Sequence, residues 1–220
     1  MNYKVIITGT TGMVGEGVLI ECLEHPQISE VLSVSRRPTG MSHPKLKEYL
    51  VPDFLSLQAG DENLKGYDAC FYCAGVSSIG MKEAEYSRIT YDTTLHFAKV
   101  VLAQNPEMIF VYVSGAGTDS SEKGRLMWAR VKGRTENALL KLPFKNVYNF
   151  RPGFMKATPG QKNLLSMYKY LGWMYPFLKK VYPSGTSTLK EVGQAMIYCL
   201  TTSSDTHIWE VKDINKLGNS

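Results

Sequence analysis

Trp128 and Lys132 lie four positions apart in the stretch RLMWARVKGRTENALL, which spans residues 125–140. Side chains with this spacing share one face of an α-helix, so the two are expected to be neighbours. Lys132 could be an ordinary solvated charge on that helix. It could also be half of a catalytic pair whose usual partner is missing, because an indole cannot act as a general acid or base near neutral pH.

A second chemical feature is the sequence TGTTGMVG, which places Gly9, Gly12 and Gly15 three residues apart. It directly follows the β-branched run YKVIIT and opens a helix-like segment, which is the context that a dinucleotide-binding turn requires. Glycine there permits a tight turn, close approach of the backbone to a pyrophosphate, and close packing of helix on strand. The helix N-terminus would favour the anion. The alternative is a turn that binds nothing.

The residues after the second predicted strand select the type of dinucleotide. An acidic residue at this place would hydrogen-bond the ribose hydroxyls of NAD. The sequence instead has Ser35, Arg36 and Arg37, so no carboxylate repels a 2′-phosphate and two guanidinium groups can bind one. We therefore expect NADP, with NAD less favoured. The alternative is a pair of solvated arginines.

Alternating strand-like and helix-like segments predict an α/β fold. A repeated βαβ pattern implies a doubly wound parallel sheet, the Rossmann fold, with helices on both faces and strand order 3-2-1-4-5-6. We expect residues 1–220 to form a single domain in which 154–220 contribute a small substrate or cap region. The expected strands are 3–8, 30–35, 46–51, 68–74, 107–117, 146–153 and 207–211, and the expected helices are 13–25, 84–104, 126–142 and 189–200.

Composition excludes several classes of protein. The chain has 220 residues, 44% of them hydrophobic, and a formal net charge of +5 without a dense basic run, so nucleic acid is not expected. No apolar run is long enough to span a membrane, and no signal-peptide pattern begins the chain, which predicts a soluble, cytoplasmic protein. The CFYC sequence lies in a predicted strand, so its cysteines are expected to be buried free thiols. Four scattered histidines predict no metal site.

An aromatic and basic segment covers residues 163–183. We expect it to be helical as far as Pro176. It could form a lid over a substrate pocket or a surface for a second subunit or protein partner, and resting on a membrane is a third possibility. Pro176 argues against one long helix lying on a membrane. The segment contains Lys169, Tyr170, Trp173, Tyr175, Phe177, Lys179 and Lys180.

Taken together, the glycine turn, PDF at 52–54, CAG at 73–75, VSGAG at 113–117 and RPG at 151–153 resemble the short-chain dehydrogenase/reductase superfamily. The chain is most similar to its extended and atypical NAD(P)-dependent epimerase/dehydratase-like members, among them oxidoreductases of the Tat-interacting protein 30 type. The resemblance covers most of the chain and is clearest from Lys4 to Met155.

The resemblance implies roles for individual residues. Ser114 would hydrogen-bond a substrate carbonyl, Lys132 would bind the nicotinamide ribose, and Trp128 stands where the family has its catalytic tyrosine. Asp53 would lie near the adenine and Phe154 near the nicotinamide. The full set expected to bind the cofactor is Gly9, Thr11, Gly12, Met13, Val14, Gly15, Ser35, Arg36, Arg37, Asp53, Phe54, Cys73, Ala74, Gly75, Lys132, Pro152, Gly153 and Met155.

Replacement of the tyrosine removes a proton path that is typically worth ~10²–10⁴-fold in rate. None of the possible substitutes has the helical spacing to Lys132, and Tyr112 alternates with apolar neighbours as a core residue would. Two functions therefore stay open. One is an oxidoreductase or epimerase that uses NADP(H) on a small carbonyl or hydroxyl compound, and the other is a redox-inactive NADP(H) sensor or scaffold that regulates a partner. The substitutes considered are Tyr86, Tyr91, Tyr112, Asp119 and Glu122.

Overall fold

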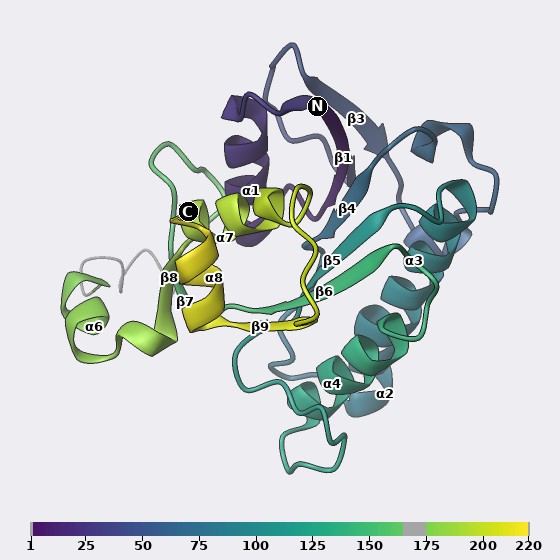
Figure 1. The fold of residues 1–220 in the computed structure, drawn as a ribbon. Helices are drawn as coiled ribbons and strands as arrows, with labels where there is room; N and C mark the ends of the chain where they lie inside the picture. Colours follow the sequence, from purple (N-terminus) through teal and green to yellow (C-terminus); the bar gives the residue numbers. More distant parts are fainter. Residues whose placement is uncertain (1, 165–174, 220) are drawn as a thin grey trace.

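The structure, a computed structural model, describes residues 2–164 and 175–219. Its centre is a seven-stranded sheet in the order β3-β2-β1-β4-β5-β6-β9, in which every neighbouring pair is parallel (Figure 1). The predicted order is confirmed, and β9 extends it beside β6. The strands are β1 (Tyr3–Thr8), β2 (Ile28–Ser35), β3 (Leu46–Leu50), β4 (Ala69–Tyr72), β5 (Ile109–Val113), β6 (Asn146–Arg151) and β9 (Ile208–Glu210).

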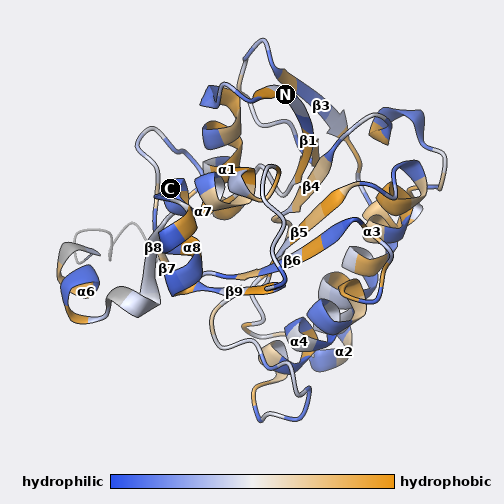
Figure 2. Ribbon diagram, in the orientation of Figure 1, coloured by the Kyte–Doolittle hydropathy of each residue, from blue (hydrophilic) through white to orange (hydrophobic). Residues whose placement is uncertain are grey.

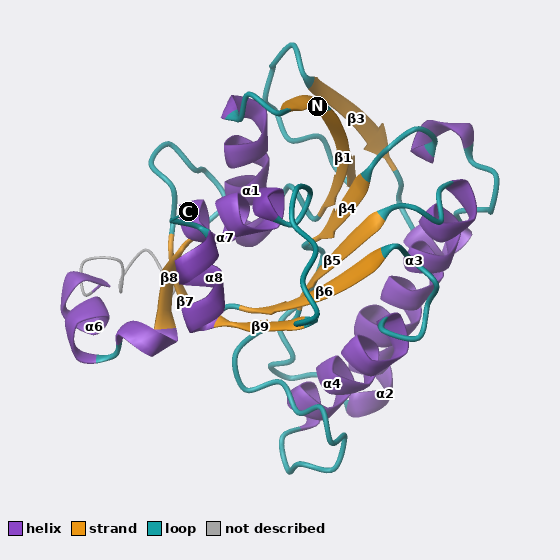
Figure 3. Cartoon of the chain, in the orientation of Figure 1, coloured by secondary structure: helices purple, strands orange, loops and turns teal. Residues whose placement is uncertain are grey.

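Helices cover both faces of the sheet, as predicted (Figure 3). One face carries α1 (Met13–Glu24), α7 (Leu189–Tyr198) and α8 (Val211–Leu217), and the other carries α3 (Thr93–Gln104) and α4 (Met127–Leu139). The predicted helix 84–104 is present, but it consists of α2 (Glu83–Ser87), a π-helical turn η3 (Arg88–Asp92) and α3. Two short 3₁₀ turns, η1 (Phe54–Ser56) and η2 (Glu62–Leu64), follow β3.

Both faces of the sheet are buried, which explains why its strands are apolar almost throughout. Along β5, Ile109 and Val111 belong to the cluster under α1 and α7, whereas Phe110 and Tyr112 belong to the cluster under α3 and α4. Figure 2 shows β4 and β5 as largely hydrophobic strands at the centre of the molecule. The prediction that Tyr112 is a core residue is confirmed, since it is 2% exposed.

Although α7, α8 and β9 belong to the main sheet and its covering helices, the other described elements after residue 153 form a small cap beside that sheet (Figure 1). It contains a two-stranded parallel sheet of β7 (Phe154–Lys156) and β8 (Thr186–Thr188), the helix α6 (Tyr175–Val181) and the 3₁₀ turn η5 (Pro183–Gly185). The prediction that the helix ends at Pro176 is wrong, because α6 continues beyond it. Proline suits the first turn of a helix, where no hydrogen bond from its nitrogen is needed. Tyr170 and Trp173 lie outside the described residues.

All four cysteines are free, and of the two in CFYC, both predicted to be buried, only Cys70 is fully buried. Cys70 is buried in β4, and burial raises the pKa of its thiol well above the ordinary value. Cys73 follows the strand and is half-buried.

No helix among the described residues is long and apolar enough to cross a membrane.

Trp209 packs the last strand, β9, against β6. Its ring centroid lies 5.0 Å from that of Tyr148 and 5.1 Å from that of Phe150, and its indole N–H donates to the Thr206 carbonyl at 2.6 Å. We expect Trp209→Ala to lower the free energy of unfolding by about 3–5 kcal/mol, because a large buried side chain is replaced by a cavity. Urea unfolding monitored by circular dichroism measures this loss.

A matched control is Phe177→Ala, which removes an aromatic ring that is 63% exposed on α6. Its effect should stay within about 0.5 kcal/mol. Equal losses in the two variants would contradict the role assigned to Trp209.

Candidate functional site

The glycine turn between β1 and α1 needs each of its glycines for a different reason. Gly9 has a φ of +69°, and a Cβ there would lie 2.7 Å from the backbone nitrogen of Ala74. A Cβ on Gly15 would lie 2.2 Å from the Gly9 carbonyl oxygen. A Cβ on Gly12 would meet only that same oxygen, at 3.3 Å, so this position borders open space. The turn therefore has a closed inner side and an open outer side.

The end of β4 forms the neighbouring wall of this turn. The Thr8 hydroxyl accepts a hydrogen bond of 3.1 Å from the Ala74 backbone and so joins the carboxyl ends of β1 and β4. A Cβ on Gly75 would meet no atom within 4 Å. Cys73 packs against the core, and burial raises the pKa of its thiol to about 12, so it stays protonated. Here the strand order reverses, where doubly wound sheets bind their ligands.

The other predicted residues of the turn contribute mainly backbone. Met13 is buried and Val14 packs against the core, whereas Thr11 is half-buried. The Met13 carbonyl accepts a hydrogen bond from the Gln161 side chain, which comes from the cap. The first turn of α1 is thus already tied to a distant part of the chain.

Glu16 strengthens this link, and sequence reasoning missed it. Its buried carboxylate accepts hydrogen bonds from the backbone of Lys162 at 2.8 Å and of Asn163 at 2.6 Å. Residues 161–163 therefore form a strap from the cap to α1. An acidic residue in the first turn of a helix was the available signal, but its partners lie more than 140 positions away.

The basic residues after β2 are accessible, whereas the serine is not. Arg36 and Arg37 are exposed, and no described side chain binds either guanidinium group. Ser35 is 3% exposed and its hydroxyl donates to the Arg37 carbonyl at 2.6 Å. The expected contact of this hydroxyl with a cofactor is therefore not supported, because the hydroxyl shapes the Arg37 backbone instead.

The residues of the PDF sequence after β3 also include both exposed and buried side chains. The exposed Asp53 carboxylate accepts a hydrogen bond of 2.9 Å from the Leu55 backbone and caps η1. Phe54 is 8% exposed, and its ring centroid lies 5.1 Å from that of Phe97. Its side chain is part of the core, so the expectation that it lines the cofactor site is corrected. Asp53 stays available at the surface.

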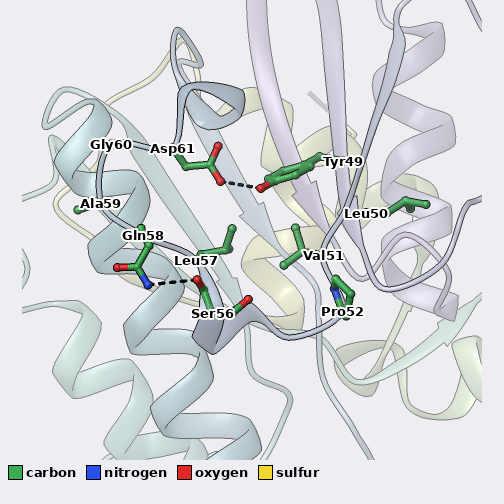
Figure 4. A pocket seen from close by; sticks show the side chains of 10 residues that line it. All are labelled: Tyr49, Leu50, Val51, Pro52, Ser56, Leu57, Gln58, Ala59, Gly60 and Asp61. Carbon is green, nitrogen blue, oxygen red and sulfur yellow. Dashed lines mark hydrogen bonds between the residues drawn. The ribbon is translucent and has the colours of Figure 1, made fainter.

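A cavity of about 360 Å³ lies beside this segment at the edge of the sheet (Figure 4). In Figure 4 the Tyr49 hydroxyl and the Asp61 carboxylate point toward each other, and the hydrogen bond between them is 2.6 Å long. That bond raises the pKa of Tyr49, with burial as a smaller cause. The cavity is lined by Tyr49, Leu50, Val51, Pro52, Ser56, Leu57, Gln58, Ala59, Gly60 and Asp61.

At the carboxyl end of β5, Ser114 makes contacts inside the protein that the sequence did not predict. The residue is 2% exposed, and its hydroxyl donates to Glu136 at 2.5 Å and to the Phe150 carbonyl at 3.1 Å. Its hydroxyl is therefore engaged inside the protein, and the expected contact with a substrate carbonyl stays a prediction. Ser114 links β5 to α4 and β6.

Glu136 is the centre of a buried polar network that sequence reasoning missed. Its side chain has no exposed surface and also accepts two hydrogen bonds from Arg151, at 3.0 and 2.5 Å. Arg151 in turn donates to Glu210 at 3.1 Å. Glu136 stands four residues after Lys132 on the same helix, so helical spacing was a signal that could have found it.

Lys132 lies at the corner where β5 and β6 end. Its ammonium group donates to the Ser114 carbonyl and lies 3.8 Å from the point where a Cβ on Gly115 would be. Burial lowers its pKa to about 8, although the negative charge of Glu136 opposes that shift. The prediction that this lysine is more than a solvated surface charge agrees with this position.

Trp128 points its ring at the loop after β5. Its indole six-membered ring would lie 3.4 Å from a Cβ on Gly117, which has a φ of +84°. Gly117 therefore leaves room for a ring larger than tyrosine. The two aligned residues, Trp128 and Lys132, lie on one helix as expected, but the serine hydroxyl is not with them.

The residues considered as substitutes for the catalytic tyrosine are buried or bound to other residues. Tyr86 is 1% exposed, and burial raises its pKa. The Asp119 carboxylate accepts hydrogen bonds from Ser121 and from the Gly124 backbone, which hold its pKa below the ordinary value. Tyr91 lies under the guanidinium of Arg134, 4.2 Å from ring centroid to carbon. Glu122 accepts from Asn137 at 2.8 Å.

A larger cavity, of about 540 Å³, opens beside this corner. The predicted residues after β6 border it: Gly153 and Phe154 line it, and the Pro152 carbonyl accepts the Ala116 N–H at 2.9 Å. Met155 lies in β7 and packs partly against the core. The lining is Ala116, Gly117, Gly153, Phe154, Leu178, Tyr182, Ser184, Gly185, Thr186, Glu210, Val211 and Lys212.

Comparison with known proteins places this geometry in a family. Residues 5–124, more than half of the chain, match the model of the NAD dependent epimerase/dehydratase family. The chain belongs to that family. This agrees with the predicted resemblance to extended and atypical short-chain dehydrogenases, and it makes the glycine turn part of a nucleotide-binding oxidoreductase or epimerase fold.

Two solved structures share the fold. MoeE5 in complex with UDP-glucose and NAD has a TM-score of 0.67 at 16% identity, over 98% of this chain and 80% of that one. ADP-L-glycero-D-manno-heptose-6-epimerase of Helicobacter pylori has a TM-score of 0.66 at 16% identity, over 97% of this chain and 80% of that one. At these identities the likeness concerns the fold alone.

Relatives by sequence come from fungi. Leucinostatins biosynthesis cluster protein T of Purpureocillium lilacinum is 30% identical over 63% of this chain, which spans about half (51%) of that protein. Protein FMP52, mitochondrial, of Debaryomyces hansenii is 30% identical over 68% of this chain and 66% of its own. The same name is given to a relative from Coccidioides immitis, 27% identical. These mitochondrial relatives contradict the prediction of a cytoplasmic protein, which is wrong.

The two sides of the glycine turn should respond differently to an added methyl group. Gly15→Ala should lower the free energy of unfolding by about 1–3 kcal/mol, because its Cβ would overlap the Gly9 backbone. Gly12→Ala, the matched variant, should stay within about 1 kcal/mol because it affects only an N-cap. Urea unfolding of the cofactor-free proteins measures both. A larger loss in Gly12→Ala would contradict this assignment.

Proposed function

We propose that the chain binds NADP(H) and acts as an oxidoreductase or epimerase on a small carbonyl or hydroxyl compound. The observation that carries the proposal is the glycine turn, open at Gly12, at the point where strand order reverses. Its backbone N–H groups and the α1 dipole suit a pyrophosphate. When bound, the dinucleotide would supply hydride transfer.

The residues around the glycine turn fit a bound NADP(H) molecule. Arg36 and Arg37 would hold a 2′-phosphate, because their guanidinium groups are exposed and bind no described side chain. Asp53 would border the adenine, and Ala74 and Gly75 would lie along the turn. Lys132 would contact the nicotinamide ribose. The cavity beyond Gly117 and Gly153 is large enough for a small substrate.

The preference for NADP rests on the two arginines and can be tested alone. Arg36→Ala should weaken NADPH binding about tenfold or more and leave NADH binding nearly unchanged, since a charge-assisted hydrogen bond contributes about 1.5–3 kcal/mol. Fluorescence titration of both dinucleotides measures the affinities. Arg88→Ala, an exposed arginine on η3, is the control and should change neither affinity. Equal wild-type affinities for NADPH and NADH would refute the preference.

A second function is favoured by two observations. Trp128 replaces the tyrosine, and the Ser114 hydroxyl is bound by Glu136 inside the protein. Both losses leave cofactor binding intact. A redox-inactive NADP(H) sensor or scaffold, in which the cofactor controls contacts with a partner, is therefore the alternative. Because both functions require the dinucleotide, binding alone does not separate them.

Single-turnover oxidation of bound NADPH separates the two functions. The wild type should oxidise NADPH in the presence of a panel of small ketones and diketones if the enzyme function holds. Trp128→Tyr restores a hydroxyl four residues before Lys132, and Trp128→Phe is the matched control without one. No wild-type turnover, with activity appearing only in Trp128→Tyr, would establish the sensor and exclude the enzyme.

A further inference from the structure

Among the described residues, the corner at the ends of β5 and β6 has a lysine but no tyrosine on α4 beside it, and Tyr182, which lines the larger cavity, is 61% exposed. A carbonyl oxygen that gains charge as hydride arrives must receive a proton. Trp128 cannot give one, and the Ser114 hydroxyl is already donated to Glu136. Tyr86 and Tyr112 are buried in the protein, and Asp119 is held by its own loop. The proton donor must come from another group.

We propose that Lys132 is itself the general acid and base of this site, with its ammonium group donating directly to the carbonyl oxygen of the substrate. This inference rests on the proposed oxidoreductase function and adds a role for the same lysine. It also specifies the substrate as a carbonyl compound on reduction, or the matching alcohol on oxidation.

The geometry of the corner favours this role. The Lys132 ammonium carries three N–H bonds, and the Ser114 carbonyl is the one acceptor that the described residues offer it. The adjacent Gly115 has no side chain, and a Cβ there would lie 3.8 Å from the ammonium nitrogen. That space is therefore free for a substrate oxygen. The larger cavity begins one residue further on, at Ala116 and Gly153.

The charges around the corner suit an acid that works near neutral pH. On its own helix Lys132 faces Glu136, whose carboxylate is already bound by Arg151 from β6 and by Ser114, which directly follows β5. Arg151 also binds Glu210 at the end of β9, and the buried Tyr112 lies near enough to Glu136 for that charge to help raise its pKa. Burial lowers the pKa of Lys132 to about 8, against the opposing charge of Glu136. An acid with a pKa near the working pH is the most effective.

The reaction balances with groups already named. The carbonyl carbon gains a hydride with two electrons from NADPH, which is oxidised to NADP⁺. The π electron pair moves to the carbonyl oxygen, which takes a proton from Lys132 and becomes a hydroxyl. Lys132 is left as a neutral amine, and water then returns its proton. In the opposite direction the neutral amine removes the proton from the alcohol.

Lys132→Arg and Lys132→Met test the proposal by two readouts. Arginine keeps the positive charge but does not release its proton, so single-turnover reduction of 2,3-butanedione should fall about 10²–10⁴-fold in both variants. NADPH affinity should change less in Lys132→Arg than in Lys132→Met. In the wild type the reduction rate should fall as pH rises through about 8, because the ammonium is lost.

The second readout needs neither cofactor nor substrate. Reductive ¹³C-methylation and NMR should show one lysine signal that titrates near pH 8 in the wild type, and this signal should be missing in Lys132→Arg. A Lys132 signal that titrates with the surface lysines would overturn the proposal. So would a Lys132→Arg variant that reduces butanedione at the wild-type rate.

The outcomes separate this proposal from the proposed function. If wild type and Lys132→Arg turn over equally, the enzyme stands and Lys132 is not the acid. If the wild type binds NADPH but never turns over, both the enzyme and this role fall. Glu210 is the rival donor, since it lines the larger cavity. Loss of the pH midpoint in Glu210→Gln, with the midpoint retained in Lys132→Arg, would assign the proton to Glu210 and overturn the proposal.

Discussion

The buried ion pair of Glu136 and Arg151 is the interaction on which the arrangement of residues at the ends of β5 and β6 depends. It joins α4 to β6, and through Ser114 it also holds the end of β5. Removing one partner of such a pair typically costs about 3–5 kcal/mol, because the other charge is left buried without compensation. Because this pair is so costly to break, it fixes both the rotation of α4 about its axis and its position along the sheet. The position of Lys132, one helical turn before Glu136, follows from it.

The same network gives Ser114 a structural role beside the one that the family resemblance implies. The Ser114 hydroxyl has one proton to donate, and Glu136 is an ionised acceptor inside the protein. Exposing that hydroxyl to a substrate would leave the carboxylate with one fewer donor. The corner therefore keeps its serine as a structural link, while the neighbouring Gly115 leaves space open beside Lys132. Retention of a family residue is not by itself retention of its role.

Most of the fold could be predicted from the sequence because its causes are local. Apolar runs such as IFVYV in β5 have both faces buried, and the glycine turn has backbone requirements that only glycine satisfies. Strands β7 and β8 have three residues each, too few for a period to be seen, and α8 begins directly after β9. The partners of Ser114, Phe54 and Glu16 could not be predicted, since each lies more than twenty positions away in the chain.

The two halves of the site therefore depend on different parts of the molecule. The half proposed to bind the cofactor is built from short backbone segments at the ends of β1, β2 and β4, none of which contacts Trp128 in the hydrogen bonds that the structure describes. The half proposed to bind the substrate is built from α4, β6 and the cap, whose strap also reaches back to Glu16 on α1. Because that strap bonds the first turn of the cofactor helix to the cap, the two halves are mechanically joined.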